Sequence, residues 1–288
     1  MYKFIQTQKG HYPVEVQCRV LKVSRSSYYA WRSGITYGIN SQDKQKEQAV
    51  IKSFQTHRRR YGVRRLVPEL REQGMLVGPY RVRKILRKHG LKAIQPRSFV
   101  PKTTDSRHPY FISPNLLMDR FTIHGLNEVW VGDITYLPLE DGQWAYLCTW
   151  MDLYSRRIVG WAIELHMEES LVINALKRAL GTRNVPHEMI IHSDRGGQYA
   201  GNAFRLLLDK YHLRQSMSRA DNPYDNAFME SYFSRFKAEL LENGEFENVE
   251  DARTETFEYI EMYYNPIRRH SSLNYISPDK YEKISNFV

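Results

Sequence analysis

The sequence predicts a chain in which a basic, all-α amino-terminal part precedes an α/β domain. Charge is the first observation: residues 1–118 hold 24 Lys and Arg against 6 Asp and Glu, whereas residues 119–288 hold 18 against 26. Apolar periodicity is the second, because it is helical before residue 95 and strand-like in three runs after residue 121. The net charges of +18 and −8 indicate that the two parts have different partners.

Length and composition limit the classes of protein that fit. A chain of 288 residues with 42% hydrophobic residues supports two or three domains. It contains no apolar run long enough to cross a bilayer and no apolar block of a signal peptide, so we expect a cytoplasmic protein, associated with the nucleoid when bound to DNA. Cys18 and Cys148 form no CxxC pair and are expected to be core thiols.

The first basic segment is "HYPVEVQCRVLKVSRSSYYAWRS", which predicts two short helices. Val14, Cys18 and Leu21 recur at helical spacing, and Ser24 is a suitable cap for the second helix. This is the helix-turn-helix pattern, which would turn three residues toward a DNA groove. These candidates are Arg25, Ser26 and Ser27. An ordinary helical hairpin is the alternative.

A second basic helical segment begins at "HRRRYGVRRL". Gly74 and Gly90 end helices in it, and Gly78-Pro79 begins one. Two helices with apolar stripes and basic remaining faces favour a second DNA-binding pair, although solvated surface helices are the alternative. The candidate DNA contacts are Arg58, Arg59, Arg60, Arg64, Arg65, Arg81, Arg83 and Lys84. The Pro-containing stretch that follows predicts a linker.

The α/β part has the element order βββαβαβα. Its first strands are "EVWVGDITYLPL", "QWAYLCTWMDLYS" and "RRIVGWAIEL", rich in aromatic and β-branched residues and joined by short turns. Helices at 168–181 and 202–212 then alternate with short strands at 187–194 and 213–218. A further helix carries "NAFMESYFSRFKAEL", and a final helix is predicted over 249–270.

Three acidic residues stand out by position. Asp133 interrupts an otherwise apolar strand, Asp194 ends a strand just before "RGGQY", and Glu230 lies in a helix. Oxygen ligands without His or Cys at ligand spacing suit a hard cation such as Mg²⁺ or Mn²⁺. Two such ions about 4 Å apart can drive an in-line phosphoryl displacement. With a DNA-binding front half, this predicts a nuclease or strand-transfer enzyme.

The helix that carries Glu230 has two predicted faces. Glu230, Ser234 and Lys237 share one, on which Lys237 could hold a DNA phosphate or simply be solvated. A second face, Phe228, Tyr232 and Phe236, should pack on the sheet. The helix entrance is predicted from Asn222 as N-cap, Pro223 at the first position and Asp225 completing a capping box, with Asp221 as a turn residue. In the tail, Arg268 and Arg269 are candidate DNA contacts, unless the tail wraps the core.

Several of these motifs together resemble one family. "WVGDITYL", "HSDRGGQYA", "SMSRADNPYDNAFMESYFSRFKAEL" and "YYNPIRRHSSLNYISPDKYE" are similar to the DDE transposases of bacterial insertion sequences, the OrfB type of the IS3 family, whose core is similar to retroviral integrase. Asp194 and Glu230 are separated by 35 residues, the spacing of that family's D,D(35)E motif. "RRRYGVRRL" and "VSRSSYYAWR" also resemble its amino-terminal segments.

The resemblance implies an RNase H-like five-stranded mixed sheet flanked by helices. It implies that Asp133, Asp194 and Glu230 are catalytic and bind two Mg²⁺ ions, with Mn²⁺ as a substitute. It also implies cleavage at terminal inverted repeats and transfer of the 3′-OH to target DNA. The expected partners are double-stranded DNA, other copies of the chain on that DNA, and a fusion partner encoded in an upstream frame.

Two other functions are compatible with the same motifs. One is a non-catalytic DNA-binding regulator derived from a transposase, which would not need the acidic triad. The other is a structure-specific nuclease that cuts without joining. The expected domains are a helix-turn-helix segment at 1–40, a second basic segment at 41–95, a linker at 96–120, a catalytic core at 121–245 and a carboxyl-terminal helix and tail at 246–288.

Overall fold

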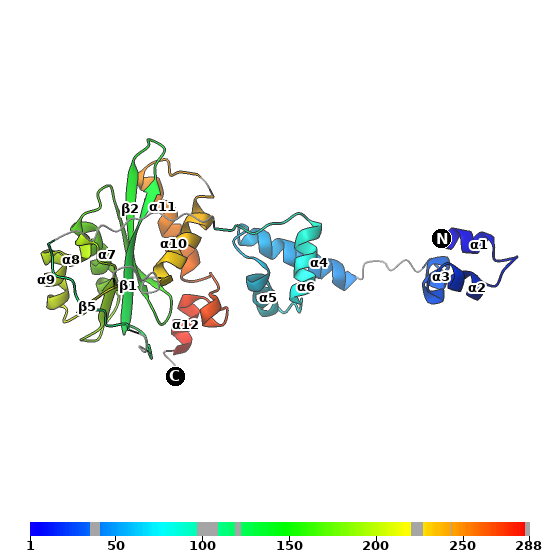
Figure 1. Ribbon diagram of the computed structural model, residues 1–288, viewed down its shortest axis with the longest axis horizontal. Helices are drawn as coiled ribbons and strands as arrows, with labels where there is room; N and C mark the ends of the chain where they lie inside the picture. The colour runs from blue at the N-terminus through cyan, green and yellow to red at the C-terminus, as the bar shows by residue number, and fades with distance from the viewer. Residues whose placement is uncertain (35–40, 97–108, 119–121, 220–226, 243, 286–288) are drawn as a thin grey trace. The chain divides into compact units, whose positions relative to one another are not determined.

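The computed structural model describes residues 1–34, 41–96, 109–118, 122–219, 227–242 and 244–285 (Figure 1). The chain divides into two compact units. The first contains Met1–Arg58 and Leu66–Leu91, and the second contains Arg59–Arg65 and Lys92–Val288. A short basic stretch within the amino-terminal half therefore groups with the carboxyl-terminal unit. No helix of the described residues is long and apolar enough to span a membrane.

The first unit begins with three short helices around a small core. They are α1 (Tyr2–Thr7), α2 (Val14–Val20) and α3 (Arg25–Arg32). Ile5, Cys18 and Tyr28 are buried together. Ser24 caps α3 as predicted, because its side chain accepts a hydrogen bond from the Ser27 amide. The predicted helix pair is confirmed, and α1 is an additional helix that the sequence pattern did not indicate.

Three further helices follow, and all but the first three residues of the second of them belong to the first unit. They are α4 (Ser41–Thr56), α5 (Val63–Glu72) and α6 (Pro79–Lys88). The predicted stripe of α6, namely Val82, Ile85 and Leu86, is buried. Gly74 and Gly90 follow their helices with φ of +79° and +64°, the left-handed conformation that suits a glycine after a helix end. The polar stretch 41–48 forms the start of α4, at the predicted start of the second basic segment.

The second unit is built on a five-stranded mixed sheet in the order β3-β2-β1-β4-β5 (Figure 1). The strands are β1 (Val129–Pro138), β2 (Trp144–Asp152), β3 (Ile158–Glu164), β4 (Ile190–Ser193) and β5 (Arg214–Met217). The first three run antiparallel, as their short turns predict, while β4 and β5 run parallel to β1. The predicted fold class is confirmed.

Helices cover both faces of the sheet. Successive side chains of a strand point to opposite faces, and the central strands place apolar side chains on both of them. One face packs against α7 (Glu169–Thr182), α8 (Gly197–Ala200) and α9 (Asn202–Lys210). The other packs against α10 (Ala227–Leu240) and α11 (Val249–Phe257). The last predicted helix does not continue to residue 270, because α11 passes into a π-helix over Glu258–Tyr264. Cys18 and Cys148 are free and buried, as expected.

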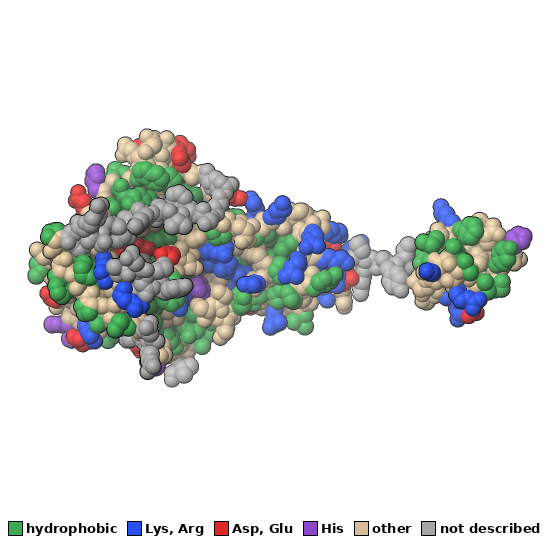
Figure 2. All heavy atoms as spheres, viewed as in Figure 1, with side chains coloured by type: hydrophobic (Ala, Val, Ile, Leu, Met, Phe, Trp, Pro, Cys, Tyr) green, Lys and Arg blue, Asp and Glu red, His purple; other side chains and the backbone are tan. Residues whose placement is uncertain are grey.

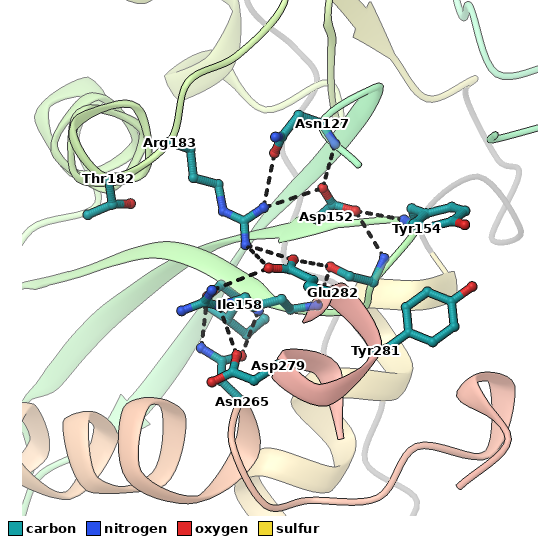
Figure 3. A network of polar contacts seen from close by, with 12 residues as sticks. Asn127, Asp152, Tyr154, Ile158, Thr182, Arg183, Asn265, Asp279, Tyr281 and Glu282 are labelled. Carbon is teal, nitrogen blue, oxygen red and sulfur yellow. Dashed lines mark hydrogen bonds and ion pairs between the residues drawn. The ribbon is translucent and has the colours of Figure 1, made fainter. Parts of the chain in front are cut away.

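The chain ends in a short 3₁₀ turn (Ser271–Leu273) and α12 (Pro278–Ser285), and a buried polar network attaches α12 to the sheet (Figure 3). Arg183 donates to both carboxylate oxygens of Glu282 at 2.7 Å, and the Ser155 hydroxyl donates to Glu282 at 2.6 Å. Asp152 accepts hydrogen bonds from three backbone amides, those of Asn127, Tyr154 and Ser155. These bonds satisfy a carboxylate that would otherwise be costly to bury.

Candidate active site and nucleic-acid interface

Asp133 lies on β1, and Asp194 directly follows the end of β4, the parallel strand beside it. The register of β1 and β4 pairs Val131 with His192. Asp133 and Asp194 each follow two residues later, so the same register continued places them side by side. Neighbouring strands lie about 4.8 Å apart. The sheet topology therefore brings together two carboxylates that are separated by 60 residues in the sequence.

Each carboxylate is oriented by the backbone that follows it. The amide of Ile134 donates to Asp133 Oδ1 at 2.8 Å, and the amide of Gly196 donates to Asp194 Oδ1 at 3.0 Å. A Cβ atom on Gly196 would lie 3.1 Å from Asp194 Oδ1 and 2.9 Å from Gln198 Oε1. The glycine therefore provides the room in which the Asp194 carboxylate folds back onto its own turn.

The negative charges of Asp133 and Asp194 act on two buried neutral groups nearby, the Cys148 thiol and the Tyr199 hydroxyl. Cys148 Sγ lies 3.8 Å from the Tyr199 hydroxyl. Burial raises the pKa of both groups; their mutual hydrogen bond lowers that of Cys148, while the charges of Asp133 and Asp194 raise both. Both groups therefore stay protonated at neutral pH. Two carboxylates beside a neutral, buried surface favour the binding of a hard cation.

Helix α10 runs past Asp133 and carries Glu230 in its first turn. Lys237 is half-buried, and burial lowers its pKa overall, while the charge of the Asp133 carboxylate offsets part of this lowering. Lys237 is thus electrostatically coupled to the first carboxylate. Glu230 is exposed on the same helix, two turns earlier.

The buried face of α10 differs in one position from the prediction. Tyr232 and Phe236 are buried as expected, but Phe228 is 44% exposed. The Arg156 guanidinium lies 4.1 Å above the centre of the Phe228 ring, a cation–π contact at the start of the helix. Met229 and Phe233 take part in the buried face instead.

The three acidic candidates do not form one metal-binding cluster in this structure. Within the described ranges, no three His, Cys, Asp or Glu side chains converge closely enough to hold an ion. The register of β1 and β4 brings Asp133 and Asp194 together, and Glu230 lies on α10. The predicted helix entrance, Asp221, Asn222, Pro223 and Asp225, lies outside the described residues.

His192 lies inside the sheet, on β4 between β1 and β5. Its ring is fully buried, with Nδ1 2.8 Å from the Ser216 hydroxyl and Nε2 3.3 Å from the Ser218 hydroxyl. These contacts tie β4 to the strand beside it, two residues before Asp194. The histidine therefore supports the strand that precedes Asp194.

The basic candidates fall into two groups according to exposure. Exposed positions with DNA-contacting potential are Arg25, Ser26, Arg58, Arg59, Arg64, Arg83 and Lys84. The backbone amide of half-buried Ser27 donates to the Ser24 cap. Three of the arginines make ion pairs: Arg25 with Glu15 at 3.3 Å, Arg59 with Glu242 at 2.8 Å and half-buried Arg81 with Asp43 at 2.7 Å. Exposed ion pairs are weak, and a phosphate could replace the carboxylate.

The second group consists of arginines whose side chains make contacts inside the carboxyl-terminal unit. Arg268 and Arg269 are 3% and 8% exposed, and both donate hydrogen bonds within the chain. Arg65 donates to the carbonyl of Arg269 at 2.8 Å. Arg60 lies over the rings of two tyrosines of the π-helix. In this structure these four arginines are occupied by intramolecular contacts, which a local count of basic residues could not show.

The exposed face of α6 includes two residues that sequence reasoning missed. Tyr80, Arg83, Lys84 and Arg87 fall at helical spacing on one face, and all are exposed. Tyr80 is 76% exposed. Figure 2 shows Lys and Arg side chains spread over the surface of α4–α6. The sequence held a signal for both residues: Tyr80 lies three residues before Arg83 and Arg87 four residues after it, which places all three on one face of a helix.

Three regions of the chain match known domain families. Residues 124–223 and residues 211–278 match families described as "Integrase core domain". Residues 41–99 match a family described as "HTH-like domain". The integrase matches include Asp133, Asp194 and Glu230, and the HTH-like match includes α4, α5 and α6.

Similar proteins align over almost the whole chain. Transposase InsF for insertion sequence IS3A of Escherichia coli (strain K12) is 38% identical over 283 residues, which cover 98% of each protein. The Insertion element IS600 uncharacterized 31 kDa protein of Shigella sonnei is 38% identical and covers 93% of this chain and 99% of its own.

Solved structures show a more distant similarity. A chain of the simian T-cell lymphotropic virus intasome is 16% identical, with a TM-score of 0.44 over 75% of this chain and 70% of its own. The catalytic core domain of BIV integrase is 15% identical, with a TM-score of 0.42 over 56% of this chain and 97% of its own.

The sheet order, the register of β1 and β4 and the two kinds of domain match define an RNase H-like polynucleotidyl transferase of the integrase type, preceded by an HTH-like domain. At 38% identity over nearly its full length, the chain belongs to the IS3 family of transposases.

Proposed function

We propose that this transposase cuts DNA at the terminal inverted repeats of its element and joins the freed 3′-OH to target DNA, using Asp133, Asp194 and Glu230. The proposal is supported by the register of β1 and β4, which when continued puts Asp133 beside Asp194 at the end of β4, and by the charge of Asp133 acting on Lys237 of α10. Among the described residues, no specific contact favours the two alternatives, a non-catalytic DNA-binding regulator or a structure-specific nuclease.

The residues present fit a divalent metal. Their donor set is oxygen only, and their surroundings include two buried groups that stay neutral. Asp133, Asp194 and Glu230 would hold Mg²⁺ or Mn²⁺, with two ions proposed. When bound, such ions activate the attacking oxygen and stabilise the leaving oxygen of a phosphoryl displacement.

Other residues of the chain would position the DNA. Lys237 is half-buried beside Asp133 and would hold a phosphate close to the scissile bond, since a partly desolvated cation binds an anion more strongly than a solvated one does. The exposed face of α6, with Tyr80, Arg83, Lys84 and Arg87, would lie on the terminal repeat. Because two ends must be held together, we propose that copies of the chain associate on DNA.

The first prediction tests the three carboxylates. Asp133→Asn, Asp194→Asn and Glu230→Gln should each reduce Mg²⁺-dependent cleavage of a DNA carrying the terminal repeats by at least about 10³-fold, because each removes a charged metal ligand. Binding of the same DNA, measured by fluorescence anisotropy, should remain within about twofold, since phosphate contacts supply most of the affinity.

The matched control is Asp209→Asn, which changes an exposed acidic residue near the end of α9. It should cleave at the wild-type rate. Wild-type cleavage by any one of the three active-site variants would refute the assignment of that residue. Sequencing of the joined products distinguishes strand transfer from cutting alone.

A further inference from the structure

A buried ion pair holds the carboxyl-terminal end of α10. Glu239 and Arg268 have side chains only 2% and 3% exposed. Arg268 donates from Nε to Glu239 Oε2 at 2.9 Å and from a terminal nitrogen to Oε1, and the Tyr259 hydroxyl donates to Oε2 at 2.9 Å. One carboxylate in the last turn of the helix therefore accepts three hydrogen bonds from two elements that follow it.

The surroundings of this carboxylate favour its ionised form. Burial by itself would raise the pKa of Glu239, but the Arg268 charge and the hydrogen bonds from Arg268 and Tyr259 lower it overall. Burying such a pair costs about as much desolvation energy as the attraction returns, so its contribution lies in fixing geometry more than in stability. A bidentate arginine tolerates little displacement of its partner.

A second layer of contacts fixes the backbone around Arg268. The Tyr61 hydroxyl donates to the Ile267 carbonyl at 3.1 Å and accepts from the Arg269 amide at 2.8 Å. Arg65 donates to the Arg269 carbonyl at 2.8 Å. The residues before and after Arg268 are thus held by Arg59–Arg65, hereafter the arm.

The arm also contacts the other donor to Glu239. The Arg60 guanidinium lies 5.2 Å from the ring centre of Tyr259 and 4.6 Å from that of Tyr263. Phe236 of α10 packs edge-on against Tyr259, with ring centres 5.1 Å apart. Both side chains that hold Glu239, those of Tyr259 and Arg268, are therefore braced by the arm, a segment some 194 to 209 residues earlier in the chain that belongs to the same compact unit.

We propose that Glu239, Arg268 and Tyr259, braced by Tyr61 and Arg65 of the arm, are positioning residues that fix the axial position of α10 and thereby the height of Glu230 and Lys237 relative to Asp133. The proposal rests on the proposed function of Glu230. A helix is stiff, with about 1.5 Å of rise per residue, so a shift at Glu239 moves Lys237 and Glu230 with it. Displacements of about 1 Å can cost 10²-fold in catalysis.

The test uses the full-length chain and three variants. Glu239→Gln removes the charge but keeps the shape, Tyr61→Phe removes one hydroxyl of the arm, and the double variant Glu239→Met with Arg268→Met replaces the pair by apolar side chains of similar length. The last is expected to fold, because apolar replacement of a buried pair is often neutral for stability. The control Glu250→Gln breaks an exposed ion pair with Arg253 on α11.

Two quantities are measured: the Mg²⁺ concentration that gives half-maximal DNA cleavage, and Mn²⁺ binding to the free protein by calorimetry. We expect Glu239→Gln and the double variant to need about tenfold more Mg²⁺ and to bind Mn²⁺ correspondingly more weakly, because a displaced Glu230 is a poorer ligand. Tyr61→Phe should show a smaller shift in the same direction. Glu250→Gln should match the wild type in both.

The outcomes separate this inference from the function on which it rests. If Glu230→Gln cleaves normally, the proposed function of that residue fails, whatever the Glu239 variants do. If Glu230→Gln is inactive but a folded Glu239→Gln or double variant keeps the wild-type Mg²⁺ requirement and Mn²⁺ affinity, the positioning role is overturned. A change in thermal stability alone, with both metal readouts unchanged, also overturns it.

Discussion

Gly132 shows at the scale of one residue how the position of Asp133 is secured. A Cβ atom on Gly132 would lie 2.4 Å from the ring of Trp150, closer than atoms can approach. Trp150 is fully buried and packs against Tyr199 and Phe204 with ring centres 5.8 and 6.0 Å away, so it cannot give way. The missing side chain leaves room for the ring of Trp150, the cross-strand partner of Gly132, one residue before Asp133.

Gly132→Ala is therefore expected to lower the free energy of unfolding by about 1–3 kcal/mol, the usual cost of overpacking a core. The urea midpoint of the full chain measures this change. Gly181→Ala is the matched control, because nothing lies within 4 Å of its Cβ position in α7 and alanine is the better helix former, by up to about 1 kcal/mol. Equal midpoints for the two variants would contradict this account of Gly132.

At the scale of an element, α12 is held by charge more than by apolar packing. Its exposed side chains include Ile284, whereas its buried residues are Pro278 and Glu282. Glu282 meets Arg183, and Arg183 also reaches the Asn127 side chain at 3.1 Å, close to Asp152 (Figure 3). Burial raises the pKa of Asp152, while its backbone hydrogen bonds and Arg183 lower it. Arg183 thus pairs with two buried carboxylates, Glu282 of α12 and Asp152 of β2.

Arg183→Met should destabilise the carboxyl-terminal unit by about 3 kcal/mol, because it leaves Glu282 and Asp152 without their common cation. Thermal unfolding followed by circular dichroism measures the loss. Arg214→Met removes the partner of Glu188 in an exposed pair at 3.7 Å and should cost less than about 1 kcal/mol. A loss for Arg183→Met no larger than that of Arg214→Met would show that the network does not hold α12.

At the scale of the whole molecule, the charge separation in the sequence does not coincide with the structural division. The arm is among the most basic stretches of the chain, yet it groups with the carboxyl-terminal unit and packs against its tyrosines. Residues 66–91, which follow the arm, belong to the other unit. Removing the amino-terminal half therefore deletes part of the core's own support together with the DNA-binding helices.

Two truncations test this division. Deletion of residues 1–95 should abolish preference for the terminal repeats and also lower the melting temperature of the remaining core, because Tyr61 and Arg65 are lost with it. Deletion of residues 1–40 should leave that melting temperature unchanged. Anisotropy with specific and scrambled DNA, together with calorimetric melting, measures both effects. Repeat-specific binding by the 1–95 deletion would refute the role of the basic helices.

Local patterns were sufficient to predict much of the fold. Strand alternation predicted β1, β2 and β3, helical spacing predicted α6 with its buried Val82, and a capping serine predicted the start of α3. Asp133 and Asp194 could be selected because an acidic residue in or after an apolar strand is locally unusual. The π-helix was not predictable, since its hydrogen-bond pattern differs from that of α11 without any change in apolar spacing.

The sequence by itself determined the order of the five strands and the family, because each depends on neighbours along the chain. Only the tertiary structure decided which charges are available to DNA. Arg83 and Arg268 both occur in basic stretches, yet one is exposed and the other is buried on Glu239, because burial depends on segments distant in the sequence. The partners of Glu239 lie 20 and 29 residues after it, and the segment that braces them lies in the other half of the chain, so the support of α10 appears only when the chain is folded.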